Sequence, residues 1–343
     1  METRPQIPTL QDVAAFANVS TASVSRCINS PDQVSEKTRK RILAAIEELG
    51  YSPNFGASAM AARRTNTVGA IIPTMENAIF ARGLQAFQEE LHLHGYTMLV
   101  ASTSYRPDVE EEQIRSLVAR GADALLLIGH ERDPKIYDFL DARGVPTIVT
   151  WAFDRTKTRP SVGFDNVAAI YNMTKEAIDR GHTRMAMISA EMFGNDRAEA
   201  RVRGIQDAMS DEGLDPRDLT TIETPYSIEN GVKAFEQILS TQPRPTVVFC
   251  GSDVFAVGAL RRAHELGVKV PEDISIVGFD DLELAQVAHP PLTTIRVPHR
   301  EMGRQAAASL VNLLKNQTPL ETIELPVELV FRSTLAPARQ SKS

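Results

Sequence analysis

The amino-acid sequence predicts an all-α N-terminal helix-turn-helix domain, followed by a larger α/β domain of two lobes. Residues 9–50 contain three segments with helix-capping residues and with apolar side chains at helical spacing. From Val68 onward, short apolar runs alternate with helical patterns, as in parallel sheets that have helices on both faces. At 343 residues the chain is long enough for two or three domains.

The first predicted helix begins after Thr9, because Asp12 three residues later completes a capping-box pattern. Its apolar stripe is expected to consist of Val13, Ala14, Phe16 and Ala17. The helix should end at Asn18, since asparagine tolerates a left-handed backbone, and Ser20 can then cap the next helix.

The second predicted helix spans residues 21–29 and presents a small, polar outer face. Val24 and Ile28 point inward, and the outer face carries Thr21, Ala22, Ser25 and Arg26. Such a face suits a helix that lies in the major groove of DNA. A third helix is expected from residue 36 to residue 49, between the cap Ser35 and the terminating Gly50.

The charge of the chain is unevenly distributed. The net charge is −7, but residues 1–66 carry 8 Lys/Arg against 6 Asp/Glu. A slightly basic head on an acidic body is consistent with DNA contact by the head alone. The first residues lack the apolar core of a signal peptide, and no apolar run approaches a membrane span. Because Cys27 and Cys250 fall in different predicted domains, we expect free thiols and a cytoplasmic protein.

Seven short apolar runs are predicted to be strands, at residues 68–72, 97–100, 124–128, 147–149, 185–188, 246–250 and 274–278. About 270 residues of alternating strands and helices are too many for one ordinary sheet, so two lobes with a cleft between them are expected. Ligands of such folds bind at the carboxyl ends of the strands.

Motifs typical of catalysis are absent from the sequence. It contains no phosphate-binding Gly-rich loop, no dinucleotide fingerprint, no His-Glu-x-x-His and no Gly-x-Ser-x-Gly. The seven histidines are scattered, and His92 and His94, two residues apart on a predicted helix, diverge and cannot share a metal ion. We therefore expect no enzyme activity, no cofactor and no metal, which leaves a recognition cleft.

The spacing of residues 9–54 resembles the lac-repressor (LacI) family of bacterial transcription regulators. The matching residues are Thr9-Leu10-x-Asp12-Val13-Ala14, Val19-Ser20-x-x-Ser23-Val24-Ser25-Arg26, Asn29, Val34-Ser35-x-x-Thr38-Arg39 and Gly50-Tyr51-x-Pro53-Asn54. Gly-Phe-Asp-Asp at 278–281 and Pro-Leu-Thr-Thr-Ile at 291–295 extend the resemblance over nearly the whole chain. It implies a helix-turn-helix domain at 1–52, a hinge at 53–66 and a periplasmic-binding-protein-like domain at 67–343. Lobe 1 is expected at 67–164 and 293–324, and lobe 2 at 165–292 and 325–340.

The resemblance implies which residues contact DNA. Thr21, Ala22 and Arg26 would face base edges, and phosphate or flanking contacts would come from Thr9, Ser20, Ser25, Asn29 and Asn54. In the family the hinge enters the minor groove, where a large apolar side chain, usually leucine, wedges a base step open. This chain has Met60 at the wedge and Gly56 inside the hinge, and the glycine makes hinge folding costlier.

The resemblance also implies an effector site between the lobes, formed by Asn77, Ile79, Phe80, Trp151, Asp165, Arg201, Tyr226, Ser252 and Asp280. Arg201 matches the family's Arg-x-x-Gly-aromatic motif, although Ile205 replaces the aromatic residue. Trp151 could line the cleft or pack inside a lobe, and Phe80 could be a core residue. Asp165 could bind ligand or only cap a helix, and Arg201 could instead form a surface salt bridge.

The segments PTMENAIFARGLQAF and SVGFDN resemble the branch of the family that senses gluconate and related sugar acids, and an arginine suits a carboxylate. In the family, tetramers use an extra C-terminal helix with a leucine heptad, which the sequence FRSTLAPARQSKS lacks. The resemblance therefore implies a homodimeric repressor on a near-palindromic operator. A transporter's solute-binding protein would need a signal peptide and no helix-turn-helix. A sugar-modifying enzyme would need an acid/base pair, for which Asp165 and Asp280 are the candidates.

Overall fold

The computed structural model describes residues 8–52, 64–156 and 158–339, apart from the side chain of Asn29. Most of the predicted hinge, including Asn54 and Met60, therefore lies outside the described residues. The chain divides into two compact units, residues 1–65 and 66–343. Each unit is described separately below.

The N-terminal unit contains α1 (Leu10–Phe16), α2 (Thr21–Asn29), a 3-10 turn (Pro31–Gln33) and α3 (Glu36–Leu49). The predicted capping box is present, since Asp12 N donates to Thr9 Oγ1 at 3.3 Å and Thr9 N donates to Asp12 Oδ2 at 2.8 Å. Asn18 and Gly50 both adopt the left-handed conformation, as expected, with φ of 48° and 61°. The core of this unit consists of Val13, Ala14, Ala17, Val24, Cys27, Ile42, Ala45 and Tyr51.

Phe16 does not belong to this core, contrary to the prediction. Its side chain is 59% exposed. At 100° per residue, Phe16 lies about 160° from Ala14 around the helix, so the two side chains cannot share one face. The buried face of α1 is the narrower set of Val13, Ala14 and Ala17.

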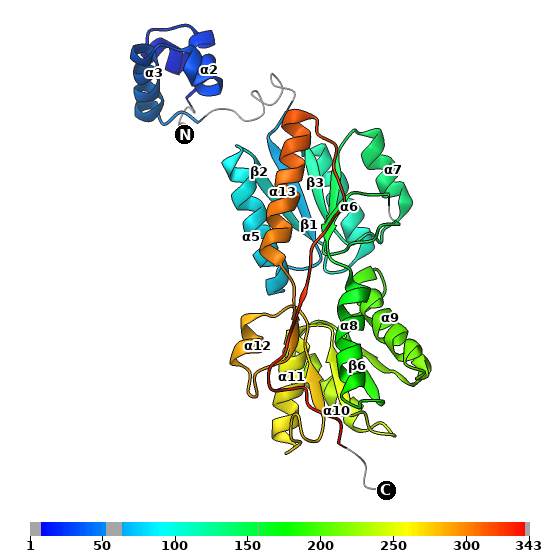
Figure 1. Cartoon of the computed structure of the whole chain (residues 1–343). Helices are drawn as coiled ribbons and strands as arrows, with labels where there is room; N and C mark the ends of the chain where they lie inside the picture. The colour runs from blue at the N-terminus through cyan, green and yellow to red at the C-terminus, as the bar shows by residue number, and fades with distance from the viewer. Residues whose placement is uncertain (1–7, 53–63, 157, 340–343) are drawn as a thin grey trace, which may run out of the picture. The chain divides into compact units, whose positions relative to one another are not determined.

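The first lobe of the larger unit is built on a parallel sheet with strand order β11-β5-β4-β3-β1-β2. Its strands are β1 (Thr67–Ile72), β2 (Thr97–Ser102), β3 (Ala124–Ile128), β4 (Thr147–Thr150), β5 (Ser161–Gly163) and β11 (Ile323–Glu324). Successive side chains of β3 point to opposite faces of the sheet. Leu125 and Leu127 belong to the core cluster on the first face, and Leu126 belongs to the core cluster on the second. The α6 (Pro107–Ala119) and α7 (Pro134–Ala142) helices cover the first face, and α5 (Ala78–Leu93) and α13 (His299–Asn316) cover the second (Figure 1).

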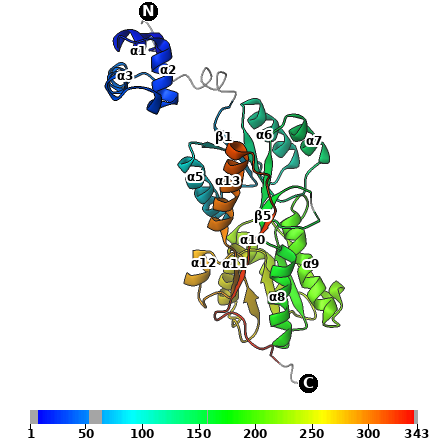
Figure 2. The same ribbon diagram turned by 45° about the horizontal axis from the view of Figure 1, so that its top comes forward.

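The helices α5 and α13 lie side by side, as Figure 2 shows from a second direction. Two glycines allow this close approach. A Cβ atom on Gly303 would lie 2.0 Å from the carbonyl oxygen of Gly83. This contact ties the C-terminal helix of the lobe to its first helix.

The second lobe has a parallel sheet with strand order β7-β6-β8-β9. The strands are β6 (Met185–Ser189), β7 (Thr220–Glu223), β8 (Val247–Cys250) and β9 (Ser275–Val277). The helices are α8 (Asn166–Asp179), α9 (Asp196–Asp211), α10 (Ile228–Leu239), α11 (Asp253–Glu265) and α12 (Glu283–Val287). The α10 and α11 helices pack on one face of the sheet, and α8 and α9 on the other.

The predicted lobe boundaries separate two strands that in fact pair with each other. β10 (Thr294–Arg296) and β12 (Glu328–Val330) form their own antiparallel ladder rather than joining either large sheet. The boundaries expected from the sequence assign β10 to lobe 1 and β12 to lobe 2. Among the described residues, no helix is long and apolar enough to cross a membrane.

Candidate functional site

The outer face of α2 carries the side chains expected to meet DNA. Thr21, Ala22 and Arg26 are exposed, and Ser25 is half-buried. Ser20 precedes the helix, where its Oγ accepts a hydrogen bond from Ser23 N at 3.2 Å. The exposed face is therefore small and polar with a single cation, which is the arrangement that fits a major groove.

Eight of the nine expected effector residues line one cavity of about 40 Å³ in the larger unit. They are Asn77, Ile79, Phe80, Trp151, Arg201, Tyr226, Ser252 and Asp280. The cavity lies at the carboxyl ends of the strands, since Trp151 directly follows β4, Ser252 follows β8 and Asp280 follows β9. Both lobes contribute to it. At this volume the cavity admits a few water molecules.

Arg201 is a buried residue of α9 and not a surface cation, with 8% of the residue exposed. Its Nε donates to Asn166 Oδ1 at 3.0 Å, and its Nη1 donates to the carbonyl oxygen of Gly251 at 2.5 Å. The guanidinium also lies 3.8 Å from the centre of the Phe279 ring. Burial lowers the pKa of Arg201, and the nearby carboxylate of Asp280 opposes this shift. Because Arg201 is buried, the alternative that it forms a surface salt bridge is excluded.

Asp280 is buried in the cavity wall, where its backbone N donates to the carbonyl oxygen of Ile295 at 2.8 Å. Among the residues that the structure describes, neither of its carboxylate oxygens has a hydrogen-bond partner. Burial raises the pKa of Asp280 to about 7, and Arg201 and the Ser252 hydroxyl oppose the shift. His299 Nε2 lies 3.7 Å from Asp280 Oδ1, but burial lowers the pKa of His299 to about 3, so the imidazole is neutral. Because neither oxygen has a partner, the Asp280 carboxylate can accept hydrogen bonds from a ligand.

An aromatic wall closes one side of the cavity. Trp151 is 1% exposed, and its Nε1 donates to His299 Nδ1 at 3.2 Å. Phe80 meets the indole edge-on at a centroid distance of 5.3 Å. A Cβ atom on Gly83 would lie 2.3 Å from Trp151 Cη2, so a glycine is needed behind the ring. The sequence left open whether Trp151 lines the cleft or packs inside a lobe, and in the structure it does both.

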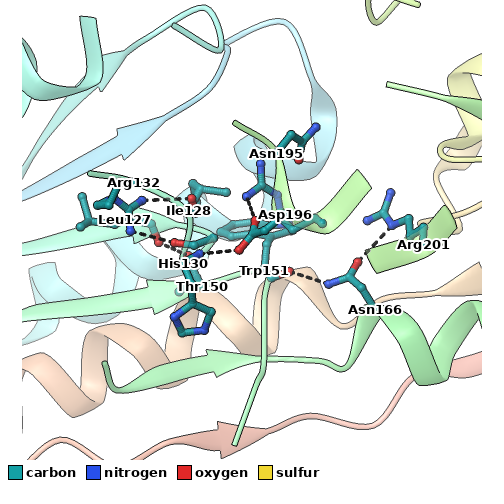
Figure 3. Close-up of polar contacts among 12 residues, drawn as sticks. Leu127, Ile128, His130, Arg132, Thr150, Trp151, Asn166, Asn195, Asp196 and Arg201 are labelled. Carbon is teal, nitrogen blue, oxygen red and sulfur yellow. Dashed lines mark hydrogen bonds and ion pairs between the residues drawn. The ribbon is translucent and has the colours of Figure 1, made fainter. Parts of the chain in front are cut away.

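Several hydrogen bonds join the lobes around the cavity. Tyr226 OH donates to Asn77 Oδ1 at 3.1 Å. Asn166 Nδ2 donates to the carbonyl oxygen of Trp151 at 3.0 Å, and Figure 3 shows Asn166 between Trp151 and Arg201. Nearby, His130 N donates to Asp196 Oδ2 at 2.6 Å (Figure 3). A ligand in the cavity would touch groups that already link one lobe to the other.

Three residues of the cavity have a backbone that L-amino acids rarely adopt. The φ values are 58° at Tyr105, 60° at Trp151 and 104° at Asp280. Such strain persists only where surrounding structure enforces it, and it clusters at functional sites. The conformations support this cavity as the functional site of the larger unit.

Asp165 is the expected effector residue that the structure places outside the cavity. Its carboxylate accepts from Ala168 N at 3.0 Å and so caps α8, and it faces a separate open hollow of about 970 Å³. The carboxylate of Asp253, next to Ser252 in sequence, also already accepts hydrogen bonds within the protein. It accepts from Thr294 Oγ1 and from Leu282 N, both at 2.6 Å, and thereby holds the loop after β9.

The sequence analysis missed several residues of the cavity, among them Tyr105, Asn195, Arg197 and Phe255. Arg197 could have been found, because it lies one helical turn before Arg201 on the same face of α9. Tyr105 lies in the loop after β2, where no motif marked it. Among the described residues, no group of three or more His, Cys, Asp or Glu side chains is arranged to hold a metal ion.

A helix-turn-helix unit joined to a two-lobed α/β unit with a polar cavity between its lobes defines a class of DNA-binding regulators controlled by small molecules. Residues 9–54 match the family described as bacterial regulatory proteins, lacI family, and residues 174–335 match a periplasmic binding protein-like domain. The chain is 30% identical to catabolite control protein A of Priestia megaterium over 95% of this chain and 98% of that protein. The chain belongs to the lacI family of bacterial regulatory proteins.

Other relatives and solved structures agree with this assignment. The HTH-type transcriptional regulator GntR of Escherichia coli strain K12 is 32% identical over 91% of this chain and 93% of that protein. The lac repressor dimer bound to operator and the anti-inducer ONPF superposes with a TM-score of 0.85 at 27% identity, over 96% of this chain and 100% of that one. The protein is therefore a transcriptional regulator and not an enzyme, and its fold is the one expected from the sequence.

Proposed function

We propose that the protein is a homodimeric cytoplasmic repressor whose effector is a sugar acid of the gluconate type. The observation that carries this proposal is the charge of the cavity. Among the described residues that line it, the charged side chains are Arg197, Arg201 and Asp280. Because the pKa of Asp280 is raised to about 7, the negative charge is partly neutralised, and the cavity favours an anion.

The geometry of Arg201 supports a carboxylate as the anionic group. The bonds to Asn166 and Gly251 use Nε and Nη1 and fix the plane of the guanidinium. Nη2 is the nitrogen that we assign to the ligand carboxylate. A charge-assisted bond in this buried setting is stronger than a bond between neutral groups.

The remaining wall suits the polyol part of such a ligand. The unpartnered carboxylate of Asp280 accepts hydrogen bonds from hydroxyls, and Asn77, Tyr226 and Ser252 add amide and hydroxyl groups. The Phe80 and Trp151 rings offer apolar surface to the C–H groups of the carbon chain. This distribution separates a carboxylate end from a hydroxyl-rich end.

Ligand entry requires the lobes to move apart, since the cavity of about 40 Å³ is too small for a six-carbon acid. A ligand that bonds to both lobes then changes their equilibrium position. If operator DNA prefers one position, ligand and DNA affinities are reciprocally coupled, typically by about 1–3 kcal/mol.

The roles at the operator follow from the exposed face of α2 and from the family resemblance. We propose that Arg26 reads a guanine, that Ala22 meets a thymine methyl and that Thr21 lies beside them. Phosphate contacts are assigned to Thr9, Ser20, Ser25, Asn29 and Asn54, and the minor-groove wedge to Met60. For Asn54, Met60 and the side chain of Asn29, the resemblance alone supports the assignment.

Tryptophan fluorescence tests the ligand class directly, because Trp151 is the single tryptophan of the sequence and lines the cavity. We expect D-gluconate to change the emission saturably and D-glucose, which lacks the carboxylate, to do so only at concentrations at least tenfold higher. Arg201→Ala should abolish the response. Arg203→Ala, two residues further along α9 and exposed, serves as the matched control and should keep it. Tighter binding of glucose than of gluconate would contradict the proposal.

A further inference from the structure

Tyr105 separates the cavity from two larger hollows at its mouth. It lines the inner cavity of about 40 Å³, an outer pocket of about 280 Å³ and a second outer pocket of about 250 Å³. Among the described residues it is the one that lines all three. Ala190, Asn195 and Tyr226 also line both the inner cavity and the pocket of about 280 Å³, so Tyr105 is one of four residues that a ligand would meet on extending from one into the other.

The backbone of Tyr105 is anchored in the first lobe. The residue lies in a turn closed by a hydrogen bond from Arg106 N to the carbonyl oxygen of Thr103, at 3.0 Å. Thr103 N in turn donates to the carbonyl oxygen of Ile72 at the end of β1, also at 3.0 Å. Both central residues of the turn, Ser104 and Tyr105, have positive φ, of 53° and 58°. Because these anchors belong to one lobe, the ring keeps its place when the lobes separate.

Strain at these two positions argues for a role of the aromatic ring. Glycine or asparagine adopts such a backbone at much lower cost than tyrosine, and strain of this kind is usually associated with function. Besides lining the pockets, the side chain interacts with Asn77, which also accepts a hydrogen bond from Tyr226. The ring is thus fixed at both its backbone and its hydroxyl end.

The pocket of about 280 Å³ beyond Tyr105 has the lining of a neutral sugar site. Besides Tyr105 and Ala190, its walls are hydroxyl, amide and carboxylate groups with a proline ring and a second tyrosine ring, supplied by Thr74, Glu76, Ser104, Glu191, Asn195, Pro225 and Tyr226. Among the described residues that line it there is no Lys or Arg. Its chemistry therefore differs from that of the inner cavity with its two arginines.

We infer that Tyr105 determines the length of the ligand, admitting a single sugar-acid unit and excluding one that carries a second sugar ring. This inference rests on the proposed function, because it takes the sugar acid of the inner cavity as given. Without the ring at position 105, the inner cavity and the pocket of about 280 Å³ join into one continuous site. A glycosylated sugar acid would then place its acid beside Arg201 and its second ring in the outer pocket.

The test compares D-gluconate with lactobionate, which is gluconate carrying one galactose, by isothermal titration calorimetry on the full chain. The wild-type chain should bind gluconate at least tenfold more tightly than lactobionate. Tyr105→Gly should tighten lactobionate binding at least tenfold and bring the affinity ratio close to one. Glycine suits the positive φ, so the turn should fold, and Tyr105→Asn provides a second small side chain that tolerates the same backbone.

Tyr105→Phe is the matched control, because it keeps the ring and loses only the hydroxyl. It should retain the wild-type preference for gluconate. If the glycine and asparagine variants bind gluconate but keep excluding lactobionate, the assignment of Tyr105 is wrong while the proposed ligand class stands. If the wild-type chain and the variants bind neither compound, the proposed ligand class fails and the inference fails with it.

Discussion

Replacing Asp280 by asparagine should stabilise the protein at neutral pH and leave its stability almost unchanged in acid. The carboxylate is buried without a hydrogen-bond partner among the described residues, and its pKa rises from 3.8 to about 7. This rise corresponds to about 4 kcal/mol of lost stability when the group must ionise in the folded state. An asparagine of the same shape does not ionise and removes this cost.

The sign of the pH dependence follows from the raised pKa. Below about pH 3 the carboxyl is protonated in both the folded and the unfolded state, so burying it requires no charge to leave water. As the pH rises toward 7, the unfolded state ionises first, and wild-type stability falls relative to Asp280→Asn. Between pH 5 and pH 8 the advantage of the variant should grow by about 2–3 kcal/mol.

Urea unfolding followed by the fluorescence of Trp151 measures this difference, because that residue reports the unit that contains Asp280. Asp165→Asn is the matched control. It makes the same chemical change at a half-buried helix cap, where asparagine caps about as well as aspartate. A difference between Asp280→Asn and the wild-type chain that stays constant from pH 5 to pH 8 would refute the reasoning.

Three further substitutions test the DNA-contact face and the packing. Arg26→Ala should weaken operator binding by about 1–3 kcal/mol and relax the preference at one base pair per half-site, as measured by competition with operator variants; equal losses on all sequences would mean that Arg26 touches only phosphate. Thr9→Ala should lower the stability of the N-terminal unit by about 1 kcal/mol in thermal unfolding, while Thr9→Ser should restore it, and an unchanged midpoint would contradict the capping box. Gly83→Ala should destabilise the larger unit by about 1–3 kcal/mol and shift the emission of Trp151, because the new Cβ would meet the indole at 2.3 Å; unchanged emission and stability would show that the contact relaxes freely.

The strands and caps that carry a strong local signal were predictable from the sequence. Each of the seven predicted strands has a counterpart, since the strands of a parallel sheet are rich in apolar residues. The strands that the sequence does not predict, β5, β7, β10, β11 and β12, are two to four residues long and are defined by pairing with other segments of the chain. Pairing of this kind depends on tertiary structure, which local periodicity does not encode.

The candidate site was predictable where its residues end a strand. Trp151, Ser252 and Asp280 each follow a predicted strand, and the parallel topology brings such positions together. Tyr105 follows β2 but sits in a turn whose two positive φ angles fall on serine and tyrosine, which carry no left-handed signal. For Asp165 the sequence left two roles open, because a carboxylate before a helix can cap it or face a ligand, and only the position of the cavity distinguishes them.

The central claim is that one chain couples sequence-specific DNA binding to occupancy of the cavity. The most direct measurement is selection of bound duplexes from a randomised DNA library at one fixed, physiological salt concentration, with and without D-gluconate. We predict that the selected duplexes share an imperfect palindrome and that gluconate changes their affinity by about fivefold or more. Selected duplexes that share no sequence, in the absence of gluconate and in its presence, would contradict the account.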